Sequence, residues 1–482
     1  MATETQRLSE IIAANAPLSL EQIIKLEIDE WKRSEHLKWM QEGRRYYRVD
    51  HEIRSRKRMM IGEGGMLQEN KNLSNRKLIH SFVRKLVDQK IGYLLSKPIS
   101  IQTGEKVYAE LLADIFDKPF LRTMKNVGKD SISAGIGWLQ VYYDENGILS
   151  FKRHRPEEII PLWRDAEHTE LDAVIRVYDV EQYVSSKKQT VTKVEFWDLR
   201  GVRRYTLNPP GLVSGVSGLV PDEDMPESGH FIVSQGDDDE VQTNWERIPF
   251  VPFKYNDDEL PLIAALKSLV DEYDLQTSDN ANNIADSPNS ILVLKDYDGQ
   301  DLGEFRRNLS QVRAIKVSGE RGGVEPLSID LNTDALEKHL DRIRKDIYEF
   351  GRGVDTQAER LGNSPSGEAL KFLYQDLDLD ANDIENEFQA SLEQLLWFVD
   401  RHIFNTAGRD YSDEQVDFIF NRDIMINETE AVNNVRNSAG TVSEETLVAN
   451  HPFVTDVSLE LERLRKQRQS ELDDPYAGGD EA

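Results

Sequence analysis

One apolar stripe toward the C-terminal end constrains this chain more than any other feature of its sequence. Between residues 366 and 405, apolar side chains recur every three or four positions, which is the spacing of one face of an α-helix. The pattern predicts one helix of roughly 38 residues, about 57 Å long at about 1.5 Å per residue. The stripe is expected to be core, so that the helix acts as a rigid strut. Its members are Leu370, Leu373, Leu377, Ala381, Ile384, Phe388, Leu392, Leu395, Val399 and Ile403.

Acidic side chains fill the other faces of this predicted helix. Nine acids and a single base, Lys371, lie between Pro365 and Asp400. The whole chain has a net charge of −28, from 59 basic and 87 acidic side chains. Residues 32–90 are the exception, with sixteen Lys and Arg against seven Asp and Glu. Because most of the surface would repel phosphates, we expect any contact with DNA to use a few cationic points.

The composition also limits the chemistry and the setting of the protein. The 482 residues contain no cysteine, which excludes disulfides, thiol catalysis and cysteine-bound metals. No run approaches the ~18 apolar residues of a membrane span. The first residues lack the basic and apolar segments of a secretory signal. We therefore expect assembly in a cytoplasm, no contact with a membrane, and about two to four domains or subdomains.

Periodicity divides the rest of the chain into helical and strand-rich parts. Period-two alternation runs from about 131 to 255 and includes a hairpin with Asn146-Gly147 in its turn. Residues 208–245 are expected to be a long flexible insertion, and the basic segment 44–58 a surface loop. Helices are predicted over 18–47, 74–95, 260–286 and 333–350, with a short strand module between the last two, and a helical region spans 441–468.

Catalytic motifs are not found in the sequence. There is no GxxxxGK[ST] motif and no HExxH pair, and the nine histidines are scattered. Asp376, Asp378 and Asp380 could be Mg²⁺ ligands, which leaves a metal-dependent nuclease or packaging enzyme as an alternative. Side chains two apart point to different faces of a helix, so a solvated acidic face is the favoured interpretation. We therefore expect no enzyme activity, no cofactor and no metal site.

The segment 351–365 stands between two strongly predicted helices. A connection in such a place is usually short and carries little charge, but this one contains several glycines and the cationic Arg352 and Arg360. Its glycines would let the loop change shape at low cost. Ser364 is expected to cap the next helix, with Pro365 at the first helical position. The alternative is an ordinary connection with solvent-exposed arginines.

Four segments, in the same order along the chain, resemble the portal proteins of tailed bacteriophages, the head-to-tail connectors of phages of Gram-positive hosts. The first is SNRKLIHSFVRKLVDQKIGYLLSKPISI at 74–101, and the most telling is GNSPSGEALKFLY at 362–374. The others are VPFKY at 251–255 and NETEAVNNVRNSAGTVSEETLVANHPFVTDVSLELERL at 427–464. Ser364-Pro365-Ser366 departs from the family's simpler N-x-S-G-x-A-L run, and its proline stiffens the end of the loop.

The resemblance implies an α+β, mainly helical portal fold with one long helix beside a central channel. It implies a dodecameric ring at one capsid vertex of the virion, through which double-stranded DNA is packaged and later ejected. The implied parts are a wing at 1–255 with a β-rich section at 131–255, stem helices at 256–286 and 333–350, a clip at 287–332, a tunnel loop at 351–365, a long wing or channel helix with its following segment at 366–429, a crown at 430–470 and a flexible tail at 471–482.

The resemblance also implies partners. These are other copies of the chain, the large terminase subunit, head-completion or adaptor proteins, the major capsid and scaffolding proteins, and DNA bound without regard to sequence. Few and weak contacts suit a duplex that must slide. The basic segment 44–58 could contact either a neighbouring subunit or DNA. The tunnel-loop residues that would face the channel are Arg352, Gly353, Arg360, Gly362, Asn363 and Ser364.

Overall fold

The structure is a computed structural model that divides into two compact units. Unit 1 comprises residues 1–48, 83–265 and 348–482, and unit 2 comprises residues 49–82 and 266–347. The residues that the structure describes are 19–61, 65–71, 73–184, 187–207, 218–235, 239–286, 291–295, 323–327, 333–356, 367–422, 428–449, 451, 453–454 and 457–472.

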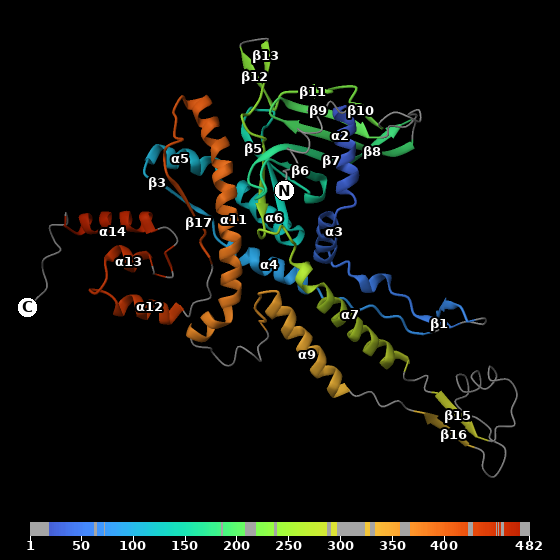
Figure 1. Cartoon of the computed structure of the whole chain (residues 1–482). Coiled ribbons are helices and arrows are strands. Elements are labelled where there is room, and N and C mark those ends of the chain that lie inside the picture. The colour runs from blue at the N-terminus through green and yellow to red at the C-terminus, as the bar shows by residue number, and fades with distance from the viewer. Residues whose placement is uncertain are drawn as a thin grey trace, which may run out of the picture. The chain divides into compact units, whose positions relative to one another are not determined.

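A six-stranded antiparallel sheet forms one part of unit 1 (Figure 1). Its long central strands, β7 (Leu171–Val184) and β8 (Lys187–Asp198), pair along eleven residue positions, from Val174↔Trp197 to Val184↔Lys187. The other strands are β6 (Ile159–Trp163), which pairs with β7, and β9 (Gly201–Leu207), which pairs with β8, β10 (Leu219–Pro221) and β11 (Glu227–Ser228).

Helix α2 (Leu20–Trp31) covers one face of this sheet (Figure 1). Ile24 and Ile28 on the helix share a buried cluster with Ile175 and Phe196 on the central strands. Two β-branched residues one turn apart face the same side of a helix, so the cluster fixes which side of α2 meets the sheet.

A second, three-stranded sheet has the order β14–β4–β5. The predicted hairpin is confirmed, because β4 (Ile136–Tyr143) and β5 (Leu149–His154) pair antiparallel around a turn in which Gly147 has a φ of 74°. On the other side, β14 (Phe250–Lys254) pairs with β4. Positive φ is the reason that glycine follows asparagine in this turn.

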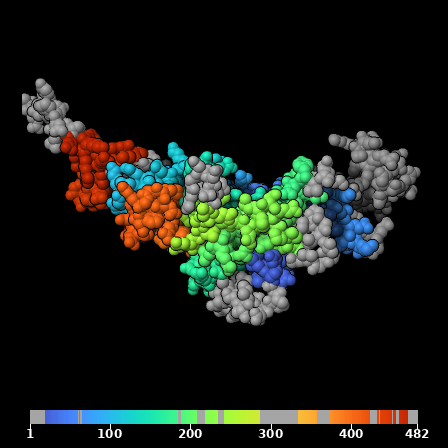
Figure 2. Space-filling model, turned by 90° about the horizontal axis from the view of Figure 1, so that it is seen from above, coloured from blue at the N-terminus to red at the C-terminus, as the bar shows by residue number. Residues whose placement is uncertain are grey.

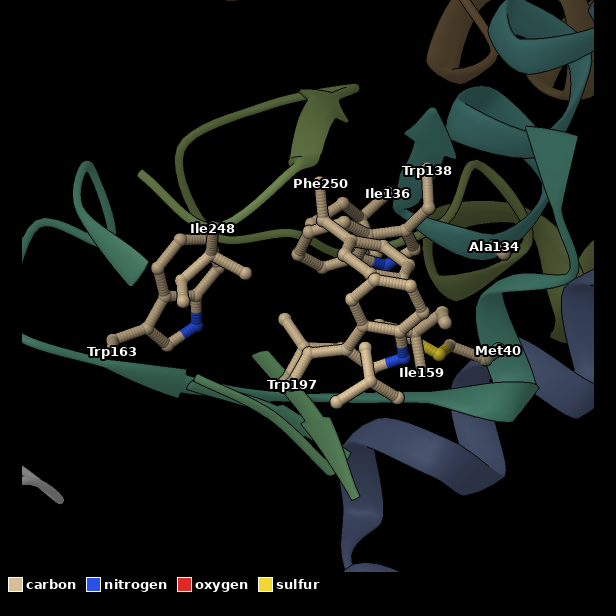
Figure 3. Packing of buried hydrophobic residues seen from close by; sticks show 11 residues of the cluster. Met40, Ala134, Ile136, Trp138, Ile159, Trp163, Trp197, Ile248 and Phe250 are labelled. Carbon is tan, nitrogen blue, oxygen red and sulfur yellow. The ribbon is translucent and has the colours of Figure 1, made fainter. Parts of the chain in front are cut away.

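An aromatic core joins the two sheets to α3 (Glu35–Tyr47) (Figure 3). Trp138 of β4 and Trp163 of β6 stack with ring centroids 5.9 Å apart, and Trp197 of β8 meets Phe250 edge-on at 5.3 Å. Met40 brings α3 into the same cluster. Because aromatic side chains bury large areas, this cluster holds the two sheets in a fixed arrangement within unit 1.

The long predicted helix is confirmed as α11 (Gly367–Ala407), which has 41 residues. Phe388 packs edge-on against Phe253 of β14 at 5.2 Å. Figure 2 shows the orange atoms of α11 beside the light-blue atoms of α5 (Lys106–Ile115), where the Tyr108 hydroxyl donates to Asp400 at 2.5 Å. The stripe members that are buried are Leu377, Ala381, Ile384, Phe388, Leu392, Leu395, Val399 and Ile403.

Shorter elements complete unit 1. They include nearly all of α4 (Phe82–Leu94), α6 (Lys118–Ala134), the hairpin of β12 (Phe231–Gln235) and β13 (Asp239–Thr243), the pair of β3 (Ser100–Thr103) and β17 (Val416–Ile419), and the helices α12 (Glu428–Asn437), α13 (Glu444–Ala449) and α14 (Val457–Leu472). Among the helices described, none has both the length and the apolar character that crossing a bilayer requires.

Unit 2 contains most of α7 (Ile263–Asp286) and of α9 (Thr333–Phe350). The helices predicted over 260–286 and 333–350 are therefore confirmed. Unit 2 also contains the 3₁₀ turn Glu52–Ser55, the hairpin of β1 (Met59–Ile61) and β2 (Leu67–Glu69), and the antiparallel pair of β15 (Ile291–Lys295) and β16 (Gly323–Leu327), which confirms strands in the module between the two helices.

Three buried side chains of α7 hold an extended segment of unit 2. They lie four residues apart on the helix, and each accepts a hydrogen bond from one backbone N–H of the segment. The three N–H groups that donate lie two residues apart. Four helical residues rise about 6 Å and two extended residues about 6.6 Å, so the two repeats match. The pairs are Asp274 with His80 at 2.8 Å, Ser278 with Leu78 at 2.9 Å and Asn282 with Arg76 at 2.6 Å.

This ladder corrects the prediction of a helix over 74–95. The helix α4 begins only at Phe82. Residues 74–81 have apolar spacing typical of a helix, but the N–H groups of Arg76, Leu78 and His80 bond to the side chains of α7. The tertiary hydrogen bonds outweigh the local preference for a helix.

The N-terminal predictions also need correction. The helix predicted over 18–47 is two helices, because Ser34 accepts from the Leu37 N–H at 3.1 Å and begins α3. The segment 44–58 is only partly a surface loop. Arg44 and Tyr46 belong to α3 and are buried, and Arg44 is 2.6 Å from Asp130.

The segment 208–245, predicted to be a flexible insertion, contains the strands β10 to β13 in its described residues. The cross-strand register of β12 and β13 runs from Phe231↔Thr243 to Gln235↔Asp239. Its Gly, Pro and acidic residues suggested flexibility, whereas β10, β12 and β13 each contain a valine or an isoleucine, residues that favour strands.

Candidate functional site at the base of the loop after α9

Helix α9 ends in a Schellman motif centred on Arg352. The Arg352 N–H donates to the Glu349 carbonyl at 3.1 Å, and the Gly353 N–H donates to the Tyr348 carbonyl at 2.9 Å. Arg352 has a φ of 46°, a left-handed conformation that costs a non-glycine residue about 1 kcal/mol or more. An arginine therefore stands where glycine would be less strained.

Two side chains of α4 fix the backbone that follows. Gln89 donates to the Val354 carbonyl at 3.1 Å and accepts from the Val354 N–H at 3.0 Å, in the manner of a paired strand. The ammonium of Lys90 donates to the Arg352 carbonyl at 3.2 Å. The first residues after α9 are therefore held at three backbone groups.

Gly353 is required for space rather than for an unusual backbone angle. A Cβ at this position would lie 2.1 Å from Cδ2 of Leu86, a side chain that is fully buried in α4. The φ of Gly353 lies outside the left-handed region. Because the backbone at Gly353 lies so close to α4, the base of the loop has no room for a side chain at this position.

The guanidinium of Arg352 lies against the acidic side of α11. Its Nη1 is 3.0 Å from Asp383 and 3.7 Å from Asp380, and the side chain is 52% exposed. Asp380 is buried, 2.7 Å from Lys90 Nζ, and accepts a hydrogen bond from the Tyr255 hydroxyl at 3.2 Å. Burial lowers the pKa of Lys90, and the neighbouring Asp380 carboxylate opposes that shift. Burial and Asp380 together raise the pKa of Tyr255.

The acids of α11 are therefore not simply a solvated face, as the sequence suggested. Asp380 is inside the protein, and Asp378 is 2.6 Å from Arg422 and 3.0 Å from the Tyr93 hydroxyl. Asp376 alone of the three is exposed. Within the part of the chain that the structure describes, no three His, Asp or Glu side chains are grouped so as to hold a metal ion. The metal-dependent alternative gains no support from these residues.

Of the residues predicted to face a channel, the structure describes Arg352 and Gly353. Arg360, Gly362, Asn363 and Ser364 lie outside the described residues. Sequence reasoning missed Lys90, although the signal was present. Lys90 follows Val83 and Leu86 at helical spacing and so falls on the buried face of α4, where a lysine needs a partner.

Comparison with known proteins gives concordant matches in sequence. The family model described as "Phage portal protein, SPP1 Gp6-like" matches residues 28–474. The portal protein of Bacillus phage SPP1 is 29% identical over 478 residues, which cover 96% of this chain and 90% of that protein. The portal protein of Clostridium phage phiCD119 is 30% identical over 427 residues, which cover 84% of this chain and 88% of that protein.

Solved structures show a more limited likeness. The neck of an empty GTA particle, computed with C6 symmetry, has a TM-score of 0.42, and the neck of a native GTA particle, computed with C12 symmetry, has a TM-score of 0.39. Each is 10% identical and covers 76% of this chain and 88% of that chain. The assignment rests on the sequence matches, which span nearly the whole chain: this protein is a member of the phage portal protein family.

Proposed function

We propose that copies of this chain close into a ring at one vertex of the phage head, and that double-stranded DNA passes through the ring during packaging and ejection. The observation that carries the proposal is the family match over residues 28–474. The role is structural: the ring is a conduit, and a terminase motor that docks on it moves the DNA. Head-completion proteins, the tail, and capsid and scaffolding proteins are the other partners.

The loop at 351–365 lines the channel in this proposal. Its base is held by Gln89 and Lys90, so Arg352 presents its guanidinium from a fixed point. An ion pair between half-exposed side chains contributes about 1 kcal/mol or less. A DNA phosphate can therefore replace Asp383 at little cost, and the arginine returns to Asp383 when the phosphate has moved on. Arg360, Gly362, Asn363 and Ser364 continue the same lining.

Weak and exchangeable contacts are what a sliding duplex requires. Each phosphate contact adds an electrostatic contribution to the affinity for DNA. This contribution does not depend on the DNA sequence and decreases as the salt concentration rises. The acidic remainder of the chain, with its net charge of −28, keeps the duplex from adhering elsewhere. In this proposal, α7 and α9 are the stem helices, β15 and β16 belong to the clip, and the segment 430–470 is the crown.

The test compares Arg352→Glu and Arg352→Gln with a matched variant, Arg342→Gln, in a packaging reaction with terminase and empty heads. Arg342 lies on α9 and is 77% exposed, with an ion pair to Asp346. We expect all three variants to form rings in negative-stain images. Arg352→Glu should package DNA most slowly, Arg352→Gln at an intermediate rate, and Arg342→Gln as fast as the unmodified protein.

Two results would contradict this role. Normal packaging by Arg352→Glu rings would show that the residue does not meet the DNA. Loss of rings in both Arg352 variants would show that it serves assembly instead.

A further inference from the structure

Exposed apolar side chains gather in one short segment of unit 2. Single exposed apolar residues are ordinary on a protein surface, but six large ones lie between residues 59 and 78, with exposed fractions from 40% to 74%. Where such side chains meet in one apolar patch, the patch marks an interaction surface. Its members are Met59, Ile61, Met66, Leu67, Leu73 and Leu78.

The register of the β1–β2 hairpin places the most exposed of these on one face. Ile61 stands directly opposite Leu67, and Met59 stands opposite Glu69. Side chains alternate between the two faces of a strand, so Met59, Ile61 and Leu67 share a face with Glu69, while Gln68 lies on the other. We call this surface the hairpin face. In a half-buried hairpin the apolar face is the covered one, whereas here it is exposed.

The hairpin is incomplete by itself. Each strand has three residues, and the two strands form a sheet with no further described strand beside them. An isolated two-stranded hairpin is marginally stable in water and needs another surface against its apolar face. Among the described residues, no other strand pairs with the outer edge of β1 or β2, and proteins usually protect such edges.

The charge beside the hairpin face indicates what covers it. Four of the five residues 54–58 are Arg or Lys. Arg56 is 2.7 Å from Asp279, whereas Arg54 and Lys57 are held more loosely, 3.6 Å from Asp50 and 3.9 Å from Glu69, and their side chains are 57% and 66% exposed. The fitting partner is apolar at its centre and acidic around it. A second copy of this chain, with a net charge of −28, has the acidic surface required.

DNA also carries negative charge, but it fits the hairpin face poorly. A phosphate backbone offers no apolar surface to cover Met59, Ile61 and Leu67, and burial of these side chains is favourable only against an apolar surface. A polar rim around an apolar centre is the usual composition of a protein interface.

We propose that the hairpin face is a contact between neighbouring copies in the ring, buried against an acidic surface of the next subunit. This proposal rests on the ring of the proposed function and adds the surface by which adjacent copies recognise each other. It assigns the basic stretch 54–58 to subunit contact rather than to DNA.

The absence of natural cysteines allows a direct test with the full chain. Ile61→Cys places one thiol on the hairpin face, and Ile148→Cys places a matched thiol in the β4–β5 turn, where the native side chain is 60% exposed. Labelling by a maleimide is followed in the monomer and ring fractions from an ultracentrifuge. We expect the thiol at position 61 to react at least about tenfold more slowly in rings, since an interface excludes reagent. The thiol at position 148 should react equally in both.

Equal labelling of position 61 in monomers and rings would overturn the proposal, as would protection that appears only when DNA is added. Ile61→Ser gives a second readout: the ring fraction should fall at a given protein concentration while the melting curve of the monomer stays the same. Unchanged ring formation would also overturn it. If the unmodified chain forms no rings, the proposed function itself fails, and that outcome is distinct from rings with an accessible hairpin face.

Discussion

The ammonium of Lys90 lies 2.7 Å from the carboxylate of Asp380, and the two side chains are 1% and 7% exposed. The residues are 290 positions apart in the chain. This buried pair joins α4 to α11, and the same ammonium holds the carbonyl of Arg352. The position of Arg352, the residue proposed to meet DNA, therefore depends on an ion pair that is buried away from solvent.

Lys90→Met should destabilise the protein by about 3–5 kcal/mol, because it leaves the Asp380 carboxylate buried without its cation. Urea unfolding measures the change. Lys118→Met, at an exposed lysine of α6, is the control and should stay within about 0.5 kcal/mol of the unmodified protein. The double variant Lys90→Met/Asp380→Leu should recover part of the loss. A Lys90→Met protein of normal stability would show that the pair is not buried.

Gly353→Ala should cost about 1–3 kcal/mol, because its methyl group would overlap the buried Leu86 side chain. Leu86→Ala removes that obstacle at its own cost of about 2–5 kcal/mol. The double variant should therefore lose less stability than the sum of the losses in the two single variants. A double-mutant cycle measures this coupling. Gly104→Ala is the matched control, since a Cβ there meets nothing within 4 Å. Strict additivity would contradict the close contact.

His154 should make the protein less stable as the pH falls. Burial, with the neighbouring charges of Arg176 and Lys152, lowers its pKa from 6.5 to about 3. The unfolded chain takes up a proton near the ordinary pKa while the folded chain does not, so stability decreases between these two pH values by up to about 1.4 kcal/mol per unit. Unfolding in urea at pH 7, 6 and 5 checks this. His154→Gln should remove this contribution to the dependence of stability on pH. An unchanged dependence on pH in this variant would contradict the assignment to His154.

Ser278→Ala tests the ladder of unit 2. The variant leaves the Leu78 N–H without its acceptor, which should cost about 1–3 kcal/mol. The Leu78 amide should also exchange with deuterium faster. Ser268→Ala, at an exposed position of the same helix, should change neither stability nor exchange. Equal exchange of the Leu78 amide in both variants would mean that Ser278 does not hold the segment.

Strong local periodicity made several elements predictable from the sequence. The α11 stripe repeats over many turns, so its existence and its buried face followed from spacing alone, and the Asn146-Gly147 turn followed from the φ that glycine permits. The family resemblance likewise rested on local runs of sequence and is confirmed by the family match.

Features decided by distant partners were not predictable in this way. Residues 74–81 have helical spacing, yet hydrogen bonds to Asp274, Ser278 and Asn282, about 200 residues away, make them extended. In the sequence, Asp380 is one of many acids on an acidic helix. Only the structure shows that it contacts Lys90 and Tyr255. A single sequence does not show which remote side chain supplies the partner.

Electron cryo-microscopy of the purified full-length particle, at a resolution that separates helices, tests the central claim most directly. The account predicts a closed ring in which the segment from Arg352 to Ser364 surrounds the narrowest part of a central channel. A particle with no closed ring, or a ring with this segment on its outer rim, would contradict it.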